Sequence, residues 1–196
     1  MRHAGIDFEE INVSLFTAEG SDLIDKWCPA KRVPVLHDGP LVLWDSLAIC
    51  EYIADKVTGQ SLWPEQADER ARARAISAEM HAGFSAMRRA MPMNCRRVVK
   101  GFKPDLEAQI DINRIVQLFE DALQQSGGPW LFGDYSVADA MYAPVATRFV
   151  TYGIKLPLLS QGYVQRTLDD QPLRDWYATA HSEAAVIAKS EIPDSL

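Results

Sequence analysis

The chain has 196 residues, 47% of them hydrophobic, so it is long and apolar enough to bury a core in one or two domains. Its 20 Lys and Arg and 27 Asp and Glu residues give a formal net charge of −7, which argues against a nucleic-acid-binding surface and favours a soluble protein. Three cysteines (Cys28, Cys50 and Cys95) form no CxxC pair, which indicates free thiols in a reducing compartment. Without a signal peptide or a membrane-length apolar run, we expect a cytoplasmic location.

The first thirty residues predict short elements of both kinds. Arg2 to Gly5 has the character of the last turn of a helix, with Gly5 as its stop. Residues 6–13 mix apolar and acidic side chains and predict a short strand. Residues 21–27 predict a helix that is capped by Ser21 and that ends at Cys28-Pro29.

A β-hairpin followed by a helix is predicted next. Residues 33–36 and 41–44 are apolar runs on either side of the turn signal Asp38-Gly39-Pro40. Asp45 or Ser46 can cap the helix that follows and leave free backbone N–H groups at its start, and such a terminus binds a carboxylate or phosphate well. An ordinary hairpin with an ordinary cap is the simpler alternative from these residues alone.

After residues 59–66, which contain Gly59, Ser61 and Pro64, the pattern becomes entirely helical. Apolar residues at helical spacing predict helices over 67–91, 104–125, 136–150 and 172–181. In the second of these, the expected buried stripe consists of Ile112, Ile115, Phe119 and Leu123. In the last, Trp176 and Tyr177 are the expected packing residues.

A capping box is predicted at the start of the third of these helices. Ser136 and Asp139 have the Ser-x-x-acid spacing in which each side chain accepts from the other's backbone N–H. We interpret this pair as structural, and Pro144 should bend the same helix. The four histidines are far apart in sequence, so neither a metal site nor a catalytic triad is predicted.

These motifs together carry a family resemblance. In their order and spacing, Val33-Pro34-Val35-Leu36, Asp45-Ser46, Leu62-Trp63-Pro64 and Ser136-Val137-Ala138-Asp139-Ala140 resemble the cytosolic glutathione S-transferases. The last stretch is similar to bacterial members, some of them near the zeta-type branch that resembles maleylacetoacetate isomerase. The resemblance implies an α/β thioredoxin-like domain over residues 1–58, a linker over 59–66 and an all-α helical-bundle domain over 67–196.

The resemblance also implies where glutathione would bind. A cis peptide at Val33-Pro34 would present the Val33 backbone to the cysteinyl part. Ser46 and the helix start would take the γ-glutamyl carboxylate, and Asp45 would balance the amino group. Arg32 would lie near the glycyl carboxylate.

A second-substrate pocket is expected in the helical domain, against Met80, Phe84, Met87, Tyr142 and Arg148. Ordinary core positions are the alternative for these residues. The resemblance further implies glutathione and a small electrophile as ligands, no metal, and a homodimer.

The resemblance also predicts that the first strand of the α/β domain, most of its first helix and the Tyr, Ser or Cys that activates the glutathione thiol are missing here. No catalytic residue is therefore nominated, and conjugation of glutathione to an electrophile is expected to be weak or absent. Two alternatives stay open: a glutathione-dependent isomerase of maleyl-type substrates, and a binding or interaction module without catalysis.

Overall fold

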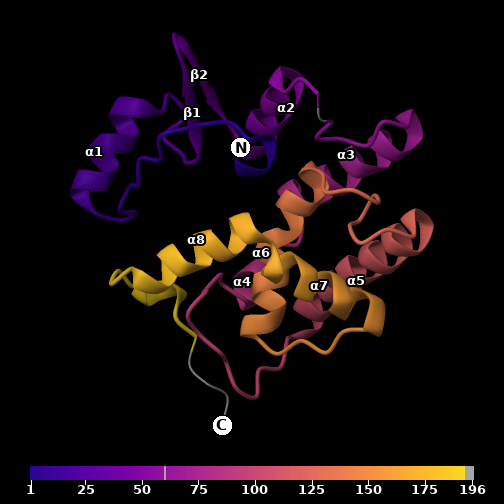
Figure 1. The fold of residues 1–196 in the computed structure, drawn as a ribbon. Coiled ribbons are helices and arrows are strands. Elements are labelled where there is room, and N and C mark those ends of the chain that lie inside the picture. Colours follow the sequence, from indigo (N-terminus) through magenta and orange to yellow (C-terminus); the bar gives the residue numbers. More distant parts are fainter. Residues whose placement is uncertain (60, 193–196) are drawn as a thin grey trace. The chain divides into compact units, whose positions relative to one another are not determined.

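The computed structural model describes residues 1–59 and 61–192, and they form two compact units, Met1–Leu62 and Trp63–Leu196. Figure 1 traces the chain through the α1, β1, β2 and α2 elements of the first unit and into the helices of the second. Each unit is described by itself below.

The first unit is built around an antiparallel hairpin. A short 3-10 turn (Arg2–Ala4) precedes α1 (Ala18–Trp27), β1 (Val35–Asp38), β2 (Leu41–Trp44) and α2 (Ser46–Lys56). Gly39 turns the hairpin with φ 58°, a left-handed conformation that glycine adopts at no steric cost. The predicted hairpin and the helix after it are confirmed.

Side-chain bonds tie α2 to the hairpin. The Tyr52 hydroxyl donates to Asp38 Oδ2 at 2.8 Å, and Lys56 forms an ion pair with the same carboxylate. Since Ile49 and Ile53 are also buried, one face of α2 is fixed against the hairpin by both apolar and polar contacts.

Two predictions for the start of the chain are wrong. Residues 6–13 form no strand in the described part of the chain, because β1 and β2 pair only with each other there and a strand exists only with a pairing partner. The first helix begins at Ala18, not at residue 21. Thr17 caps it by accepting from the Gly20 N–H at 3.0 Å, so Ser21 is already inside the helix.

The second unit is helical. It contains α3 (Ala67–Ala82), α4 (Ser85–Ala90), α5 (Leu106–Ser126), α6 (Val137–Thr151), α7 (Leu158–Asp169), α8 (Gln171–Ser182) and a short 3-10 turn (Ala188–Ser190). Neighbouring pairs are α3 with α6, α4 with α5, and α7 with α5, α6 and α8.

Four details of this unit differ from the sequence-based expectations. The helix expected over residues 67–91 is two helices, because Gly83 is extended and Phe84 adopts a positive φ of 58°. Helix α7 was not predicted at all. Pro104 lies outside α5, whose cap is Asp105. Trp176 is 39% exposed and so is not a packing residue.

The core of the helical unit is centred on α5 and α6. The predicted stripe of Ile112, Ile115, Phe119 and Leu123 is buried, as expected. Phe119 is fully buried, and its ring meets those of Tyr142 and Tyr163 edge-on at centroid distances of 5.2 and 4.8 Å. No helix in the described residues is both long and apolar enough to span a bilayer.

Candidate functional site

The hairpin register brings the two predicted halves of the site together. Val35 pairs with Trp44 as the terminal pair of the β1–β2 ladder. The residues just outside that pair, Val33-Pro34 on entry and Asp45-Ser46 on exit, therefore lie at the same end of the hairpin. Two motifs separated by ten residues in sequence thus become neighbours.

Asp45 forms the turn from β2 into α2. Its backbone has φ 75° and ψ 127°, a conformation that residues other than glycine rarely adopt. Its Oδ1 accepts from the Leu47 N–H at 3.0 Å. The predicted cap is thus Asp45, with Ser46 as the first helical residue. Strained residues of this kind concentrate at ligand sites, which supports a functional role for this end of the hairpin.

At the same end of the hairpin, the backbone around Val33 and Pro34 has hydrogen-bonding groups that a ligand can reach. The peptide between them is cis, as the resemblance implied. Val33 is 44% exposed, and no backbone bond within the described residues engages its N–H or C=O. A peptide-like ligand can therefore pair with both groups, in the manner of a short added strand.

Charged residues directly precede Val33 in the chain, and a contact farther along β1, made by His37, was missed from sequence. Arg32 is exposed, while its neighbour Lys31 pairs with Asp25 at 3.2 Å. Sequence reasoning did not find that His37 joins β1 to α1. Its Nε2 lies 2.9 Å from the Trp27 carbonyl oxygen, and the two rings meet edge-on at 5.1 Å. No local pattern signals a contact between residues on separate elements.

The cysteines of the described residues are not activated nucleophiles. Cys28 is buried, and burial raises the pKa of both Cys50 and Cys95 above that of a free thiol. Cys50 is partly buried on α2, where it can serve as a small packing residue. No group of three or more potential metal-ligating side chains occurs among the described residues.

Burial does not favour the expected second-substrate pocket. Met80, Phe84, Met87 and Tyr142 are each at most 7% exposed, and the Tyr142 hydroxyl donates to the Ile76 carbonyl at 3.1 Å. A groove of about 470 Å³ in the helical unit is lined by other residues from α5 and α7, among them Leu123, Leu158 and Tyr163. These four side chains are thus buried in this structure, and the second-substrate pocket stays a prediction.

The capping box at the start of α6 is present and is larger than predicted. Asp139 Oδ2 accepts from the Ser136 backbone N–H at 2.9 Å and from the Ser136 hydroxyl at 3.1 Å. Oδ1 accepts from the Leu131 N–H and the Tyr163 hydroxyl, each at 3.1 Å. Burial nevertheless dominates and raises the pKa of Asp139 to about 6. These contacts are all internal, which supports a structural role for Ser136 and Asp139.

Comparison with known proteins agrees with this geometry. A hairpin-containing α/β domain followed by an all-α domain is the architecture of the glutathione transferase fold. Residues 1–55 match the glutathione S-transferase N-terminal domain, and residues 69–179 match the glutathione S-transferase C-terminal domain. The chain belongs to the glutathione S-transferase family.

Individual relatives are distant in sequence and similar in fold. The chain is 26% identical over 170 residues to a probable maleylacetoacetate isomerase of Caenorhabditis elegans, which covers 85% of this chain and 79% of that protein. It is 29% identical over 147 residues to the maleylacetoacetate isomerase of Rattus norvegicus, covering 71% of this chain and 65% of that one. Among solved structures, a glutathione transferase homologue from Burkholderia with bound glutathione superposes with a TM-score of 0.71 at 21% identity, covering 93% and 88% of the two chains. A bacterial maleyl pyruvate isomerase of the zeta class gives 0.68 at 23% identity, covering 93% and 90%.

Proposed function

We propose that the N-terminal domain binds glutathione at the end of the hairpin where Val33-Pro34 and Asp45-Ser46 meet. The pairing of Val35 with Trp44 carries this proposal, because it places an open backbone segment beside the free N-terminus of α2. The family and the glutathione-bound homologue support it.

Each part of glutathione has a chemically matched partner at this site. The γ-glutamyl carboxylate accepts from the Ser46 hydroxyl and from free N–H groups of the first turn of α2. The Asp45 carboxylate faces the ammonium group, and the Val33 N–H and C=O pair with the cysteinyl backbone. The exposed Arg32 guanidinium is available to the glycyl carboxylate.

Calorimetric titration with reduced glutathione tests this proposal. The Ser46→Ala variant removes one hydrogen bond to a charged group, so we expect affinity to fall by roughly tenfold, equivalent to about 1.4 kcal/mol. Ser85→Ala is the matched control, because Ser85 is an exposed first residue of α4 in the helical unit and makes no side-chain cap. Absence of binding by the unchanged protein, or equal losses in both variants, would refute the proposal.

A glutathione-dependent cis–trans isomerisation of a maleyl-type substrate is the second candidate. Curated relatives from a nematode, rat, mouse and Vibrio cholerae are all maleylacetoacetate isomerases or probable ones by name, and their alignments cover 68–85% of this chain. The test is to supply glutathione with a maleyl diketo acid and to look for the fumaryl product. Conjugation of an aryl halide without isomerisation would favour the transferase reading instead.

Binding of glutathione without turnover of either substrate would identify a non-catalytic member of the family. A homodimer is the assembly that we propose from the family resemblance, and sedimentation at micromolar concentration checks it. A monomeric mass would contradict that part of the proposal without affecting the glutathione site. We also propose a cytoplasmic location, in keeping with the three free cysteines.

A further inference from the structure

The groove of about 470 Å³ in the helical unit is lined by residues of α5 and α7, which lie side by side (Figure 1), and of the turn after α5. Glu120 of α5 fixes its position along α7, because its Oε1 accepts from the Ser160 backbone N–H at 2.9 Å and from the Ser160 hydroxyl. Leu123 and Tyr163 are its buried lining residues. The Tyr163 hydroxyl is already bound to Asp139, so these two residues offer the groove only apolar surface.

The α7 side of the groove is an exposed apolar face. Leu158, Leu159, Gly162 and Arg166 all line the groove, and they lie on one face of the helix because they follow at positions i, i+1, i+4 and i+8. Leu158 is 86% exposed and Leu159 is 40% exposed. A single exposed apolar side chain is ordinary, but two of them beside an apolar groove are typical of an interaction surface.

Gly162 is a glycine inside this helix that the packing of the described chain does not explain. Glycine is less favourable than alanine in a helix interior. A Cβ atom at Gly162 would meet nothing within 4 Å, whereas one at Gly128, which also lines the groove, would lie 2.4 Å from Gly133 Cα. Gly128 is thus required by a close backbone contact. Gly162 instead leaves open space on the exposed face, where a second helix can approach the backbone of α7 closely.

The two ends of the groove carry opposite charges. Glu120 lies at Ser160, near the start of α7, and Arg166 follows six residues later, about 9 Å along the helix axis. Within residues 1–59 and 61–192, Arg166 forms no ion pair with a carboxylate. A face with this charge order is complementary to a second copy of itself. About a two-fold axis through Gly162, antiparallel helices bring Arg166 of each copy to the Glu120 end of the other groove.

We propose that two copies of this chain associate through this face, with α7 of each copy lying antiparallel along the groove of the other. Leu158 and Leu159 then lose their contact with water, the two Gly162 positions allow the helices to approach, and Arg166 of each copy pairs with Glu120 of the other. One helix from each copy buries a limited area, so we expect reversible association with a dissociation constant of roughly 10–100 μM. The face lies within the helical unit, and the proposal does not depend on glutathione binding.

Sedimentation equilibrium of the full chain from about 5 to about 500 μM tests the proposal around this expected dissociation constant. We expect the mass to double within this range, whatever its value at the lower end, so that the step is distinguished from a tight homodimer formed at another surface. Raising the NaCl concentration should weaken the doubling severalfold, because surface ion pairs are screened. A mass that stays constant over the whole range would overturn the proposal.

Gly162→Ala separates close helix approach from helix stability. Alanine is the better helix former, so the variant should unfold at a higher temperature and yet associate about tenfold more weakly. Gln165→Ala is the matched control, since Gln165 is exposed on the same helix and does not line the groove. The control should associate as the unchanged protein does. Equal association of both variants and the unchanged protein would overturn the proposal and would assign the doubling to another surface.

Arg166→Gln and Glu120→Gln, alone and combined, test the expected ion pair. Glutamine at position 120 keeps an oxygen that can accept from Ser160, so the contact between α5 and α7 is retained. Each single variant should weaken the doubling severalfold, and the double variant should lose no more than either single one, because both remove the same pair. Losses that add in the double variant would overturn the antiparallel arrangement.

Discussion

The Tyr163 hydroxyl of α7 donates to Asp139 Oδ1 of α6 at 3.1 Å, and both residues are buried. The same oxygen accepts from the Leu131 N–H of the segment before α6. The helix cap that begins α6 is therefore also the point at which α7 and the preceding loop are fixed. A local motif has become a junction of three segments of the helical unit.

Replacing Asp139 by Ala should destabilise the helical unit strongly. The change leaves the buried N–H groups of Leu131 and Ser136 without an acceptor, at a cost of roughly 2–5 kcal/mol in total. Chemical denaturation followed by far-UV circular dichroism measures this loss. Asp134→Ala, an acidic residue outside the hydrogen-bond network of Asp139, is the control, and a loss as small as that of the control would contradict the proposed role.

The pH dependence of stability should carry the signature of Asp139. Its pKa is raised from an ordinary 3.8 to about 6, mainly by burial, so between these values the folded protein holds a proton that the unfolded chain has lost. The stabilisation that this group contributes is then at its full value below about pH 4 and decreases as the pH rises to about 6. Above that pH it no longer changes. The free energy of unfolding of the unchanged protein, minus that of Asp139→Asn, should therefore decrease by roughly 2–3 kcal/mol between pH 4 and pH 7. A difference that does not change with pH would show that the pKa is not raised.

Phe119→Ala should produce one of the largest losses in the core of the helical unit. The side chain is fully buried between the rings of Tyr142, Phe149 and Tyr163, so its removal leaves a cavity and costs about 3–5 kcal/mol. Leu106→Ala in the same helix is the comparison, because Leu106 is 78% exposed. Thermal denaturation of both variants should separate them clearly, and similar midpoints would be inconsistent with this core.

Two substitutions at Asp45 should separate backbone strain from capping. Asp45→Ala loses the acceptor for the Leu47 N–H and keeps a side chain at φ 75°, so we expect a loss of about 1–2 kcal/mol. Asp45→Gly loses the same bond but relieves the positive φ, so its loss should be smaller. Urea denaturation of the two variants gives the comparison. If the glycine variant is the less stable of the two, strain at Asp45 is not significant.

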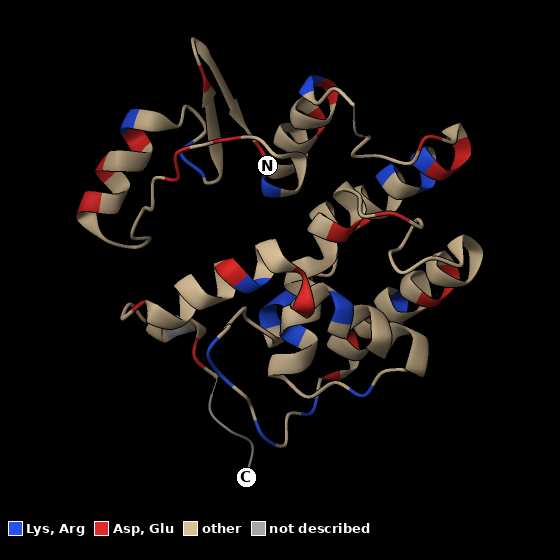
Figure 2. Cartoon of the chain, viewed as in Figure 1, with Lys and Arg blue, Asp and Glu red and all other residues tan. Residues whose placement is uncertain are grey.

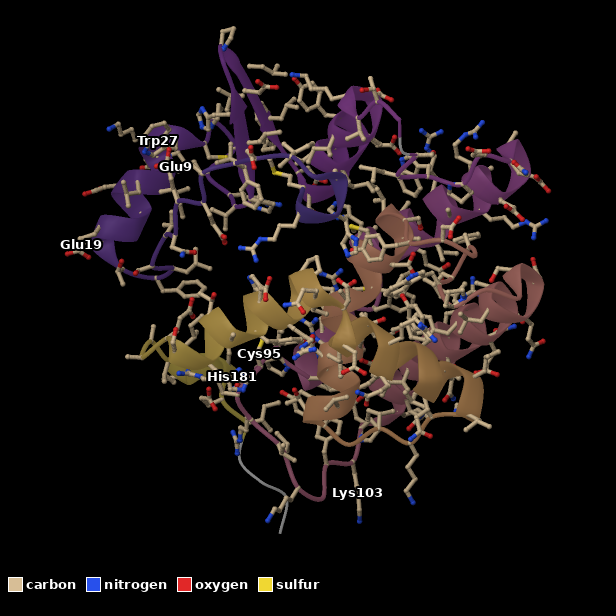
Figure 3. All side chains as sticks on the ribbon, in the orientation of Figure 1. Glu9, Glu19, Trp27, Cys95, Lys103 and His181 are labelled. Carbon is tan, nitrogen blue, oxygen red and sulfur yellow. The ribbon has the colours of Figure 1, made fainter. Side chains whose placement is uncertain are left out.

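The segment after α8 should loosen when Arg96 is replaced. Arg96 donates to the carbonyl oxygens of Glu183 and Ala185, and Asn94 donates to Glu191 Oε1 at 3.0 Å, so residues 183–191 are held to the segment between α4 and α5. Figure 2 shows the basic residues spaced along the segment between α4 and α5, and in Figure 3 Cys95 lies on that segment and His181 near the end of α8.

We therefore expect Arg96→Gln to raise amide hydrogen exchange in residues 183–191 by severalfold, because the segment has few other buried contacts. Lys103→Gln, an exposed cation on the same segment, is the control (labelled in Figure 3). Unchanged exchange in Arg96→Gln would indicate that other contacts hold the segment.

The sequence by itself determined the features that depend on neighbouring residues. The hairpin, the caps at Asp45 and Ser136, and the apolar stripe of α5 follow from turn chemistry and from periodicity, which act over a few residues. The two-domain family resemblance rests on the order of these local motifs, and the domain matches bear it out.

Only the tertiary structure decided which local tendencies were realised. Residues 6–13 have strand character but no pairing partner in the described chain, and the break at Phe84 depends on a positive φ that phenylalanine does not signal. The extra donors to Asp139 come from Leu131 and Tyr163, which helical packing brings to it from 8 and 24 residues away.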